Sequence, residues 1–214
     1  MNGNNDYYLF GTIGEKGKIE NIVLRLYFIN TLPSYMRGLF EENYGIISNL
    51  FVTVEESIKE NNSMVILLGS VNYGRIENFV INYKEQIYAR NSSRIIQDNR
   101  GIIENGYIYG KNIKILSPDS AESCGILGLT NYGGTIRNIY SLVHYEVEEN
   151  FKEKSVTSLI LNNDKGTIEN IYTVGMGNIY NVNYNPNIFY ANGNIKNSYY
   201  INDIKFNGTA DKKI

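Results

Sequence analysis

Four glutamates share one position of a repeated five-residue pattern, and they are the residues best placed to do chemistry. The pattern, called the frame below, is Gly-x-Ile-x-Asn, and the glutamates that precede its Asn are Glu20, Glu77, Glu104 and Glu169. Glu77 and Glu104 come from consecutive copies, so stacking would bring their carboxylates close enough for an acid/base pair or a cation site. Arg75 stands two residues before Glu77, and Arg137 and Lys196 take the glutamate position in other copies. This mixture of signs favours the alternative of a solvated, charge-balanced column.

Histidine and cysteine offer little further chemistry, because the chain has one of each. His144 has no second histidine with which to form a zinc motif, and we expect it in a loop or at a strand end rather than as a general base. Cys124 begins an apolar run and is interpreted as a small buried residue without a disulfide partner. The aspartates occupy unrelated positions. The sequence therefore predicts no catalytic residue, no metal ligand and no cofactor.

Tyrosines form a second candidate site. Two positions after the Asn of four frames stand Tyr107, Tyr140, Tyr172 and Tyr199. If these side chains point outward, they make a flat aromatic strip suited to binding a sugar or a protein partner. If they point inward, they form a structural ladder in the core. Leu24 and Val52 favour the outward direction and Leu142 and Val174 favour the inward one, so both alternatives stay open.

The frame recurs seven times and therefore decides the fold. Its glycines are Gly17, Gly45, Gly74, Gly101, Gly134, Gly166 and Gly193, which are 28, 29, 27, 33, 32 and 27 residues apart. Each frame follows an apolar pair, such as Leu67-Leu68, and a polar turn, and it precedes a run rich in β-branched and aromatic residues. Three short strands per repeat at this period are typical of a parallel β-helix. We predict an all-β, right-handed parallel β-helix (β-solenoid) of about seven rungs of ~28 residues.

Each residue of the frame has a mechanical role in such a helix. We expect its Ile to stack into one buried column, which comprises Ile19, Ile47, Ile76, Ile103, Ile136, Ile168 and Ile195. The Gly is expected to permit a corner conformation that a side chain would forbid. The Asn tolerates the left-handed conformation, and its amide can bond to the neighbouring rung. The predicted structural ladder, partly buried at one corner, comprises Asn21, Asn49, Asn78, Asn105, Asn138, Asn170 and Asn197.

Composition limits the classes of function. The 20 basic and 22 acidic residues give a net charge of −2, which argues against a nucleic-acid surface. The sequence shows no signal peptide, and no apolar run is long enough to predict insertion into a membrane. We divide the 214 residues into an N-terminal tail (1–6), a repeat domain (7–203) and a C-terminal tail (204–214). The array lacks clear caps, so we expect it to be a piece of a longer protein.

Several residues resemble the GLUG repeat, a family motif named for Gly, Leu, any hydrophobic residue and Gly. The resemblance rests on Gly125-Ile126-Leu127-Gly128, on Gly38-Leu39-Phe40 and on Leu68-Gly69, followed by Asn-x-Gly-x-Ile-x-Asn, and it covers residues 7–203. Some copies depart from it, as where Glu41 replaces the second Gly. The family is typical of large secreted or wall-bound bacterial proteins, notably IgA-cleaving zinc metallopeptidases, where the repeats lie apart from the catalytic domain. That domain's His-Glu-x-x-His does not occur here.

The resemblance implies an accessory, non-catalytic module of a secreted or cell-surface protein, acting as a spacer, an adhesive region or a substrate-docking region. The expected partners are other domains of the same polypeptide and a host glycoprotein, an immunoglobulin or a glycan. The unequal segments 28–36, 55–63, 111–123 and 146–155 are expected to form one edge where solenoids often bind. The alternative is a carbohydrate-active β-helix enzyme, a polysaccharide lyase or hydrolase, which would need clustered carboxylates in a groove.

Overall fold

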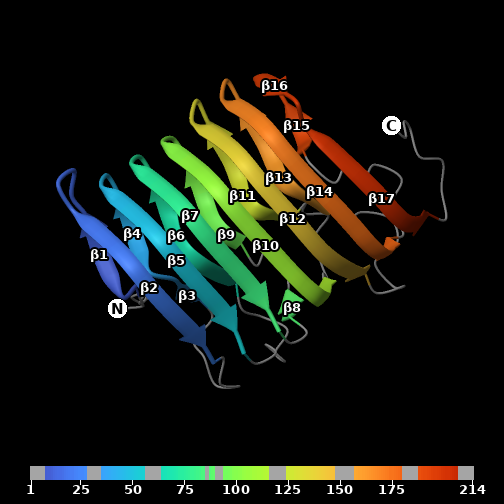
Figure 1. Cartoon of the computed structure of the whole chain (residues 1–214), viewed down its shortest axis with the longest axis horizontal. Coiled ribbons are helices and arrows are strands. Elements are labelled where there is room, and N and C mark those ends of the chain that lie inside the picture. Colours follow the sequence, from blue (N-terminus) through green and yellow to red (C-terminus); the bar gives the residue numbers. More distant parts are fainter. Residues whose placement is uncertain are drawn as a thin grey trace, which may run out of the picture.

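The computed structural model describes residues 8–27, 35–55, 64–84, 87–89, 94–115, 124–147, 157–179 and 188–206. These segments form an all-β parallel β-solenoid with rungs about 29 residues apart, which confirms the predicted fold class. Figure 1 shows the strands side by side in chain order, from the blue N-terminal end to the red C-terminal end. Within these segments, no helix is long and apolar enough to cross a membrane.

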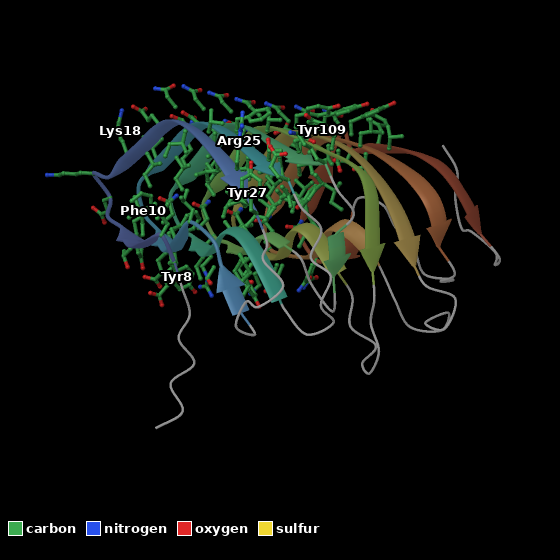
Figure 2. All side chains as sticks on the ribbon, turned by 90° about the horizontal axis from the view of Figure 1, so that it is seen from below. Tyr8, Phe10, Lys18, Arg25, Tyr27 and Tyr109 are labelled. Atoms are coloured by element: carbon green, nitrogen blue, oxygen red, sulfur yellow. The ribbon has the colours of Figure 1, made fainter. Side chains whose placement is uncertain are left out.

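Each rung contributes to two parallel sheets that enclose the core between them (Figure 2). The β1 sheet runs in the order β1 (Phe10–Ile13), β4 (Phe40–Asn43), β6 (Met64–Asn72), β9 (Arg94–Asn99), β11 (Cys124–Tyr132), β13 (Thr157–Asp164) and β15 (Ile188–Ala191), with β3 (Tyr35–Arg37) beside β6. The β2 sheet runs in the order β2 (Lys18–Leu26), β5 (Ile46–Val54), β7 (Arg75–Tyr83), β10 (Ile102–Ile115), β12 (Thr135–Val147), β14 (Thr167–Ile179) and β16 (Asn194–Lys196), with β8 (Ile87–Ala89) beside β10 and β17 (Tyr199–Phe206) beside β14.

In most rungs, the frame and the run after it form one continuous strand instead of the two strands predicted. β7, for example, continues through Asn78, which has a φ of 54°. Every other frame Asn also has a positive φ, so all rungs bend in the same way. Residues on both sides of the bend therefore stay in register with the next rung, as Glu104 does with Arg137 and Gly106 with Ile139.

The predicted isoleucine column is buried in its middle and open at its ends. The buried members, each at most 2% exposed, are Ile47, Ile76, Ile103, Ile136 and Ile168. Ile19 is only partly buried, and Ile195 is 44% exposed. The solenoid has about four turns, so the prediction of seven rungs is wrong. The five buried isoleucines span those four turns. A terminal rung has a neighbour on one side only, so it cannot cover its inward side chains completely.

The frame requires Gly because successive rungs stack closely at this position, and not because of the corner conformation that the sequence predicted. Among the described glycines, a positive φ occurs at Gly38 and Gly133, which are not the glycines of any frame. An added Cβ on Gly74 would overlap the carbonyl oxygen of Gly45 in the preceding rung, and one on Gly101 would overlap that of Gly74. Successive rungs therefore touch backbone to backbone at this corner, which leaves no room for a side chain.

Aromatic rings in the core fill the space that glycines leave in the following rung. A Cβ on Gly69 would collide with the ring of Phe40, and one on Gly106 would collide with the ring of Phe79. Both rings are at most 1% exposed. Pairing a large residue with a small one in this way gives the close packing of a protein interior.

Two buried hydroxyls interrupt the apolar core toward the C-terminal end. Ser141 and Thr173 lie in register in neighbouring strands and are 0% and 2% exposed. The same column holds Ile108 and Ile81 in earlier rungs. Neither hydroxyl has a hydrogen-bond partner, and an unpaired buried hydroxyl costs about 1–3 kcal/mol. The core is therefore less favourable here than in the preceding rungs.

We expect Gly74→Ala to lower the free energy of unfolding by about 1–3 kcal/mol, because the added methyl group would force two rungs apart. Gly11→Ala is the matched control, since a Cβ at Gly11 meets nothing within 4 Å. Its effect on stability is expected to be neutral or slightly favourable, because Ala restricts the unfolded chain. Urea unfolding followed by circular dichroism measures both variants, and equal losses would contradict the steric explanation.

Candidate functional site

The predicted asparagine ladder runs along the outside of the β2 sheet. Each frame Asn has a φ between 47° and 58°, which is the left-handed conformation. Five amide-to-amide bonds of 2.9–3.4 Å join successive rungs, from Asn49 Nδ2 donating to Asn21 Oδ1 up to Asn170 Nδ2 donating to Asn138 Oδ1. All seven side chains are exposed, so the prediction of partial burial is wrong. The left-handed bend turns the side chain away from the core.

A second asparagine ladder, which the sequence analysis missed, is buried at the corner between the two sheets. Its members, each at most 1% exposed, are Asn43, Asn72, Asn99, Asn131 and Asn163. Each of the first four donates from Nδ2 to Oδ1 of the next, at 2.7–2.8 Å. Nδ2 of Asn99 also reaches the carbonyl oxygen of Gly101 at 3.2 Å. The sequence signal was an Asn two or three residues before each of five frame glycines.

Apolar residues close the buried ladder at both ends. The register places Ile13 beside Asn43 and Ala191 beside Asn163. Amides fill every position between them, so each interior amide donates to one neighbour and accepts from the other. This arrangement satisfies polar groups that would otherwise destabilise the corner.

The four predicted tyrosines lie in one outward-facing column of the β2 sheet. The register pairs Tyr107 with Tyr140, Tyr140 with Tyr172, and Tyr172 with Tyr199. Tyr107, Tyr140 and Tyr199 are 36%, 38% and 50% exposed, whereas Tyr172 is half-buried. The inward positions of this stretch hold Ser141 and its counterpart in the next rung, which explains why the apolar pattern was ambiguous.

The tyrosine column continues toward the N-terminus as an apolar surface. Its further members are Val80, Phe51 and Val23, which occupy the same register position in β7, β5 and β2. Phe51 is 38% exposed and Val23 is 67% exposed. We call the seven residues together the aromatic strip. Figure 2 shows Tyr109, whose ring stacks on that of Tyr107 at 5.1 Å, on the outer face of this sheet.

Three rings of the strip, those of Tyr107, Tyr140 and Tyr172, lie against one another. The centroids of Tyr140 and Tyr172 are 5.5 Å apart with 6° between the ring planes. Those of Tyr107 and Tyr140 are 5.2 Å apart with 35° between the planes. A partner of the strip would therefore meet chiefly ring edges and phenol hydroxyls, because stacking occupies much of the ring faces.

A second aromatic column, also missed, lies at the corner that precedes the frame. The rings of Tyr44 and Tyr73 are parallel within 1° and 4.7 Å apart. The guanidinium of Arg100 lies between Tyr73 and Tyr132, 5.8 and 5.1 Å from their ring centroids. Desolvation raises the pKa of Tyr44, and the negative charge of Glu42, which accepts a 3.2 Å bond from its hydroxyl, adds to that rise. These residues, called the corner column, are partly exposed, and the charge of Arg100 adds cation–π contacts to the ring stacking.

The glutamates that could form an acid/base pair belong to an ion-pair network. Glu77 and Glu104 lie in register in neighbouring strands. Arg75 Nη1 is 3.2 Å from Glu77 Oε2 and 2.7 Å from Glu104 Oε1. Arg137 Nη2 is 2.6 Å from Glu104 Oε2. Both carboxylate oxygens of the 5% exposed Glu104 thus face guanidinium groups, the geometry of a charge-balanced column.

The structure places the remaining candidates by their backbone. His144 lies inside β12, in register with Met176, and not in a loop or at a strand end. In the described part of the chain, no three His, Cys, Asp or Glu residues are grouped so that they could hold a metal ion. The unequal segments between repeats lie largely outside the described residues. No protein-family profile, curated protein or solved structure matches the chain.

Stability should separate the two asparagine ladders. We expect Asn99→Ala to lower the free energy of unfolding most, by about 3 kcal/mol, because it leaves buried amides on both sides without a partner. Asn105→Ala should cost about 1–2 kcal/mol through its left-handed backbone. Asn105→Gly keeps that conformation and should cost less than Asn105→Ala. Urea denaturation measures all three, and equal losses for the two Asn105 variants would show that its amide, not its backbone, is what matters.

Proposed function

We propose that this chain is a non-catalytic β-solenoid module of a larger secreted or cell-surface protein, and that it docks a partner on the outer face of its β2 sheet. The observation that carries the proposal is the aromatic strip, a column of exposed and half-buried apolar side chains that crosses the rungs in unbroken register. Exposed aromatic residues in a continuous patch are typical of interaction surfaces. The module also serves as a spacer, because stacked rungs hold their two ends apart.

The GLUG resemblance supports the finer assignment. Leu39, Leu68 and Leu127 stand at the Leu or hydrophobic positions of that motif, and all three are at most 2% exposed in the core. These three motif positions therefore contribute to the core. A GLUG-type array would belong to a wall-bound or secreted bacterial protein, with any catalytic centre in another domain, such as that of an IgA-cleaving metallopeptidase.

The geometry of the strip favours a protein partner over face-on stacking with a glycan. Sugars bind to aromatic side chains mainly across free ring faces, whereas here neighbouring rings cover much of those faces. Ring edges and phenol hydroxyls suit a peptide surface that offers both apolar contacts and hydrogen-bond partners. The proposed partner class is therefore a host glycoprotein or an immunoglobulin, contacted through its polypeptide.

The enzyme alternative gains no support from the carboxylates. A retaining or inverting glycosidase needs one carboxylic acid to donate a proton and one carboxylate to act as nucleophile or base. Both carboxylate oxygens of Glu104 form ion pairs with arginines, and Glu77 shares one of these arginines, Arg75. Carboxylates whose oxygens already bind arginine side chains are poorly placed to contact a sugar substrate in these two roles.

We expect the purified chain to produce no new chain ends from IgA or from polygalacturonate, with or without Zn²⁺ or Ca²⁺. Mass spectrometry for the first substrate and a reducing-end assay for the second measure turnover. Cleavage that disappears in Glu104→Gln would overturn the module proposal and favour the carbohydrate-active alternative or another hydrolase.

Binding to immobilised IgA tests the docking role. We expect Tyr140→Ser to weaken binding about tenfold or more, because a central aromatic residue would be lost from the interface. Tyr44→Ser is the matched control, since Tyr44 has the same 38% exposure but belongs to the corner column. Surface plasmon resonance gives both dissociation constants. Equal weakening by the two variants would show that the strip is not the binding surface.

A further inference from the structure

We propose that copies of this chain associate head to tail, with the N-terminal rung of one copy adding onto the C-terminal rung of another. The first of these end faces consists of β1 and β2, and the second consists of β15, β16 and β17. They lie at opposite ends of the solenoid (Figure 1). The association uses the strand edges at the two ends, whereas docking uses the outer face of the β2 sheet, so the proposal does not depend on the docking role proposed above.

The N-terminal end face is apolar and open. Leu9 is 65% exposed and Phe10 is 41% exposed, whereas Phe40, the register partner of Phe10, is fully buried. Leu24 is only partly buried, and its partner Val52 is 0% exposed. Among the described residues, these side chains occupy core columns with a neighbouring rung on one side only. A further rung of the same kind would complete their burial.

Two of the usual means of blocking a sheet edge are missing from β2. The strand is nine residues long and contains no proline, and proline or an inward-pointing charge is a common means of blocking an edge. Its charged residues Lys18, Glu20 and Arg25 are exposed on the outer face, and its inward residues are aliphatic. Figure 2 shows Lys18 and Arg25 on that outer side. An added parallel strand would meet no buried charge.

At the frame, one backbone hydrogen bond between rungs always runs from an amide in one rung to a carbonyl in the preceding rung, and the two ends can extend this pattern. The amide that follows each frame Gly donates to the carbonyl oxygen of the preceding frame Gly, as in Ile46 to Gly17 at 3.0 Å and Asn194 to Gly166 at 2.9 Å. By the same rule, Lys18 of one copy would donate to Gly193 of the other. The ends therefore offer complementary groups, a donor on one and an acceptor on the other.

The side chains of the two ends also match, column by column. Ile195, which is 44% exposed, would cover the partly buried Ile19. The outer amide ladder runs from each rung to the preceding one, so Asn21 Nδ2 would donate to Asn197 Oδ1. Lys196 would come to lie beside Glu20, as Arg137 lies beside Glu104 within the chain.

These matches identify the occupant as a second copy of this chain and not a chain of another fold. A matching partner supplies a parallel strand, a left-handed Asn at the same position and a second cation for Glu20, whose Oε1 lies 3.8 Å from Lys18 Nζ in the same strand. The opposite end of the same solenoid supplies all three. Because the two surfaces differ, the contact is heterologous, and repetition produces an open linear stack instead of a closed dimer.

A charge exchange tests the arrangement by sedimentation velocity, from low micromolar to near-millimolar protein. The wild-type chain is expected to form a concentration-dependent series of species. Glu20→Lys and Lys196→Glu should each weaken association about tenfold, because each places like charges in adjacent rungs. The double variant, with both changes, restores opposite charges and should recover association. Glu41→Lys is the matched control, since Glu41 is exposed in the second rung, away from either end face, and should leave association unchanged.

Three outcomes would overturn the proposal: a wild-type chain that stays monomeric at every concentration, association that stops at a dimer, or a double variant as weak as the single ones. Far-ultraviolet circular dichroism of each variant confirms that the rungs are folded, and the recovery in the double variant is independent of any loss of fold in the single ones. The measurement contains no IgA, so its result is separate from that of the docking experiment.

Discussion

The parallel hydrogen-bond ladder between rungs is the constraint on which the rest of this structure depends. Strands joined in this way lie about 4.8 Å apart, so the backbone of every rung must follow nearly the same path as its neighbours. The frame Asn meets that requirement with one repeated bend, at a φ between 47° and 58°. The frame Gly meets it where carbonyl groups of one rung press against the next. A rung that left this path would lose hydrogen bonds on both of its sides.

The same constraint decides which side chains can share a column. Amides can donate to one neighbour and accept from another, and aromatic rings can stack, so both types repeat without penalty. Carboxylates repel one another at this distance, and the glutamate column is accordingly stabilised by Arg75 and Arg137. The resulting surface consists of stripes along the solenoid axis. Each stripe presents one kind of side chain over several rungs.

The sequence by itself determined the features that depend on local chemistry repeated at a fixed interval. The inward Ile and the left-handed Asn follow from residue types within the five positions of the frame, and the rung length follows from the spacing between frames. The structure has each of these features. Mixed signs at the glutamate position likewise indicated a balanced column, and the contacts of Glu104 with two arginines agree with it. The sequence located the tyrosine strip but did not decide whether its side chains point inward or outward. The buried positions that follow Tyr140 and Tyr172 hold Ser141 and Thr173 instead of aliphatic residues, so the alternation of apolar and polar residues is hidden there.

Only the tertiary structure decided how segments roughly one repeat apart meet. Asn72 and Asn99 look like turn residues in the sequence, yet they form a buried ladder because the corner brings them within 2.8 Å. The frame Asn, which has the same side chain, remains exposed because its bend points outward. Position 74 requires a glycine because the carbonyl oxygen of Gly45 leaves no room for a side chain, and not because of a left-handed φ. The isoleucines of the first and last frames are not completely buried, because complete burial requires a rung on each side. The sequence pattern predicts a rung at these frames but does not say whether another rung covers it.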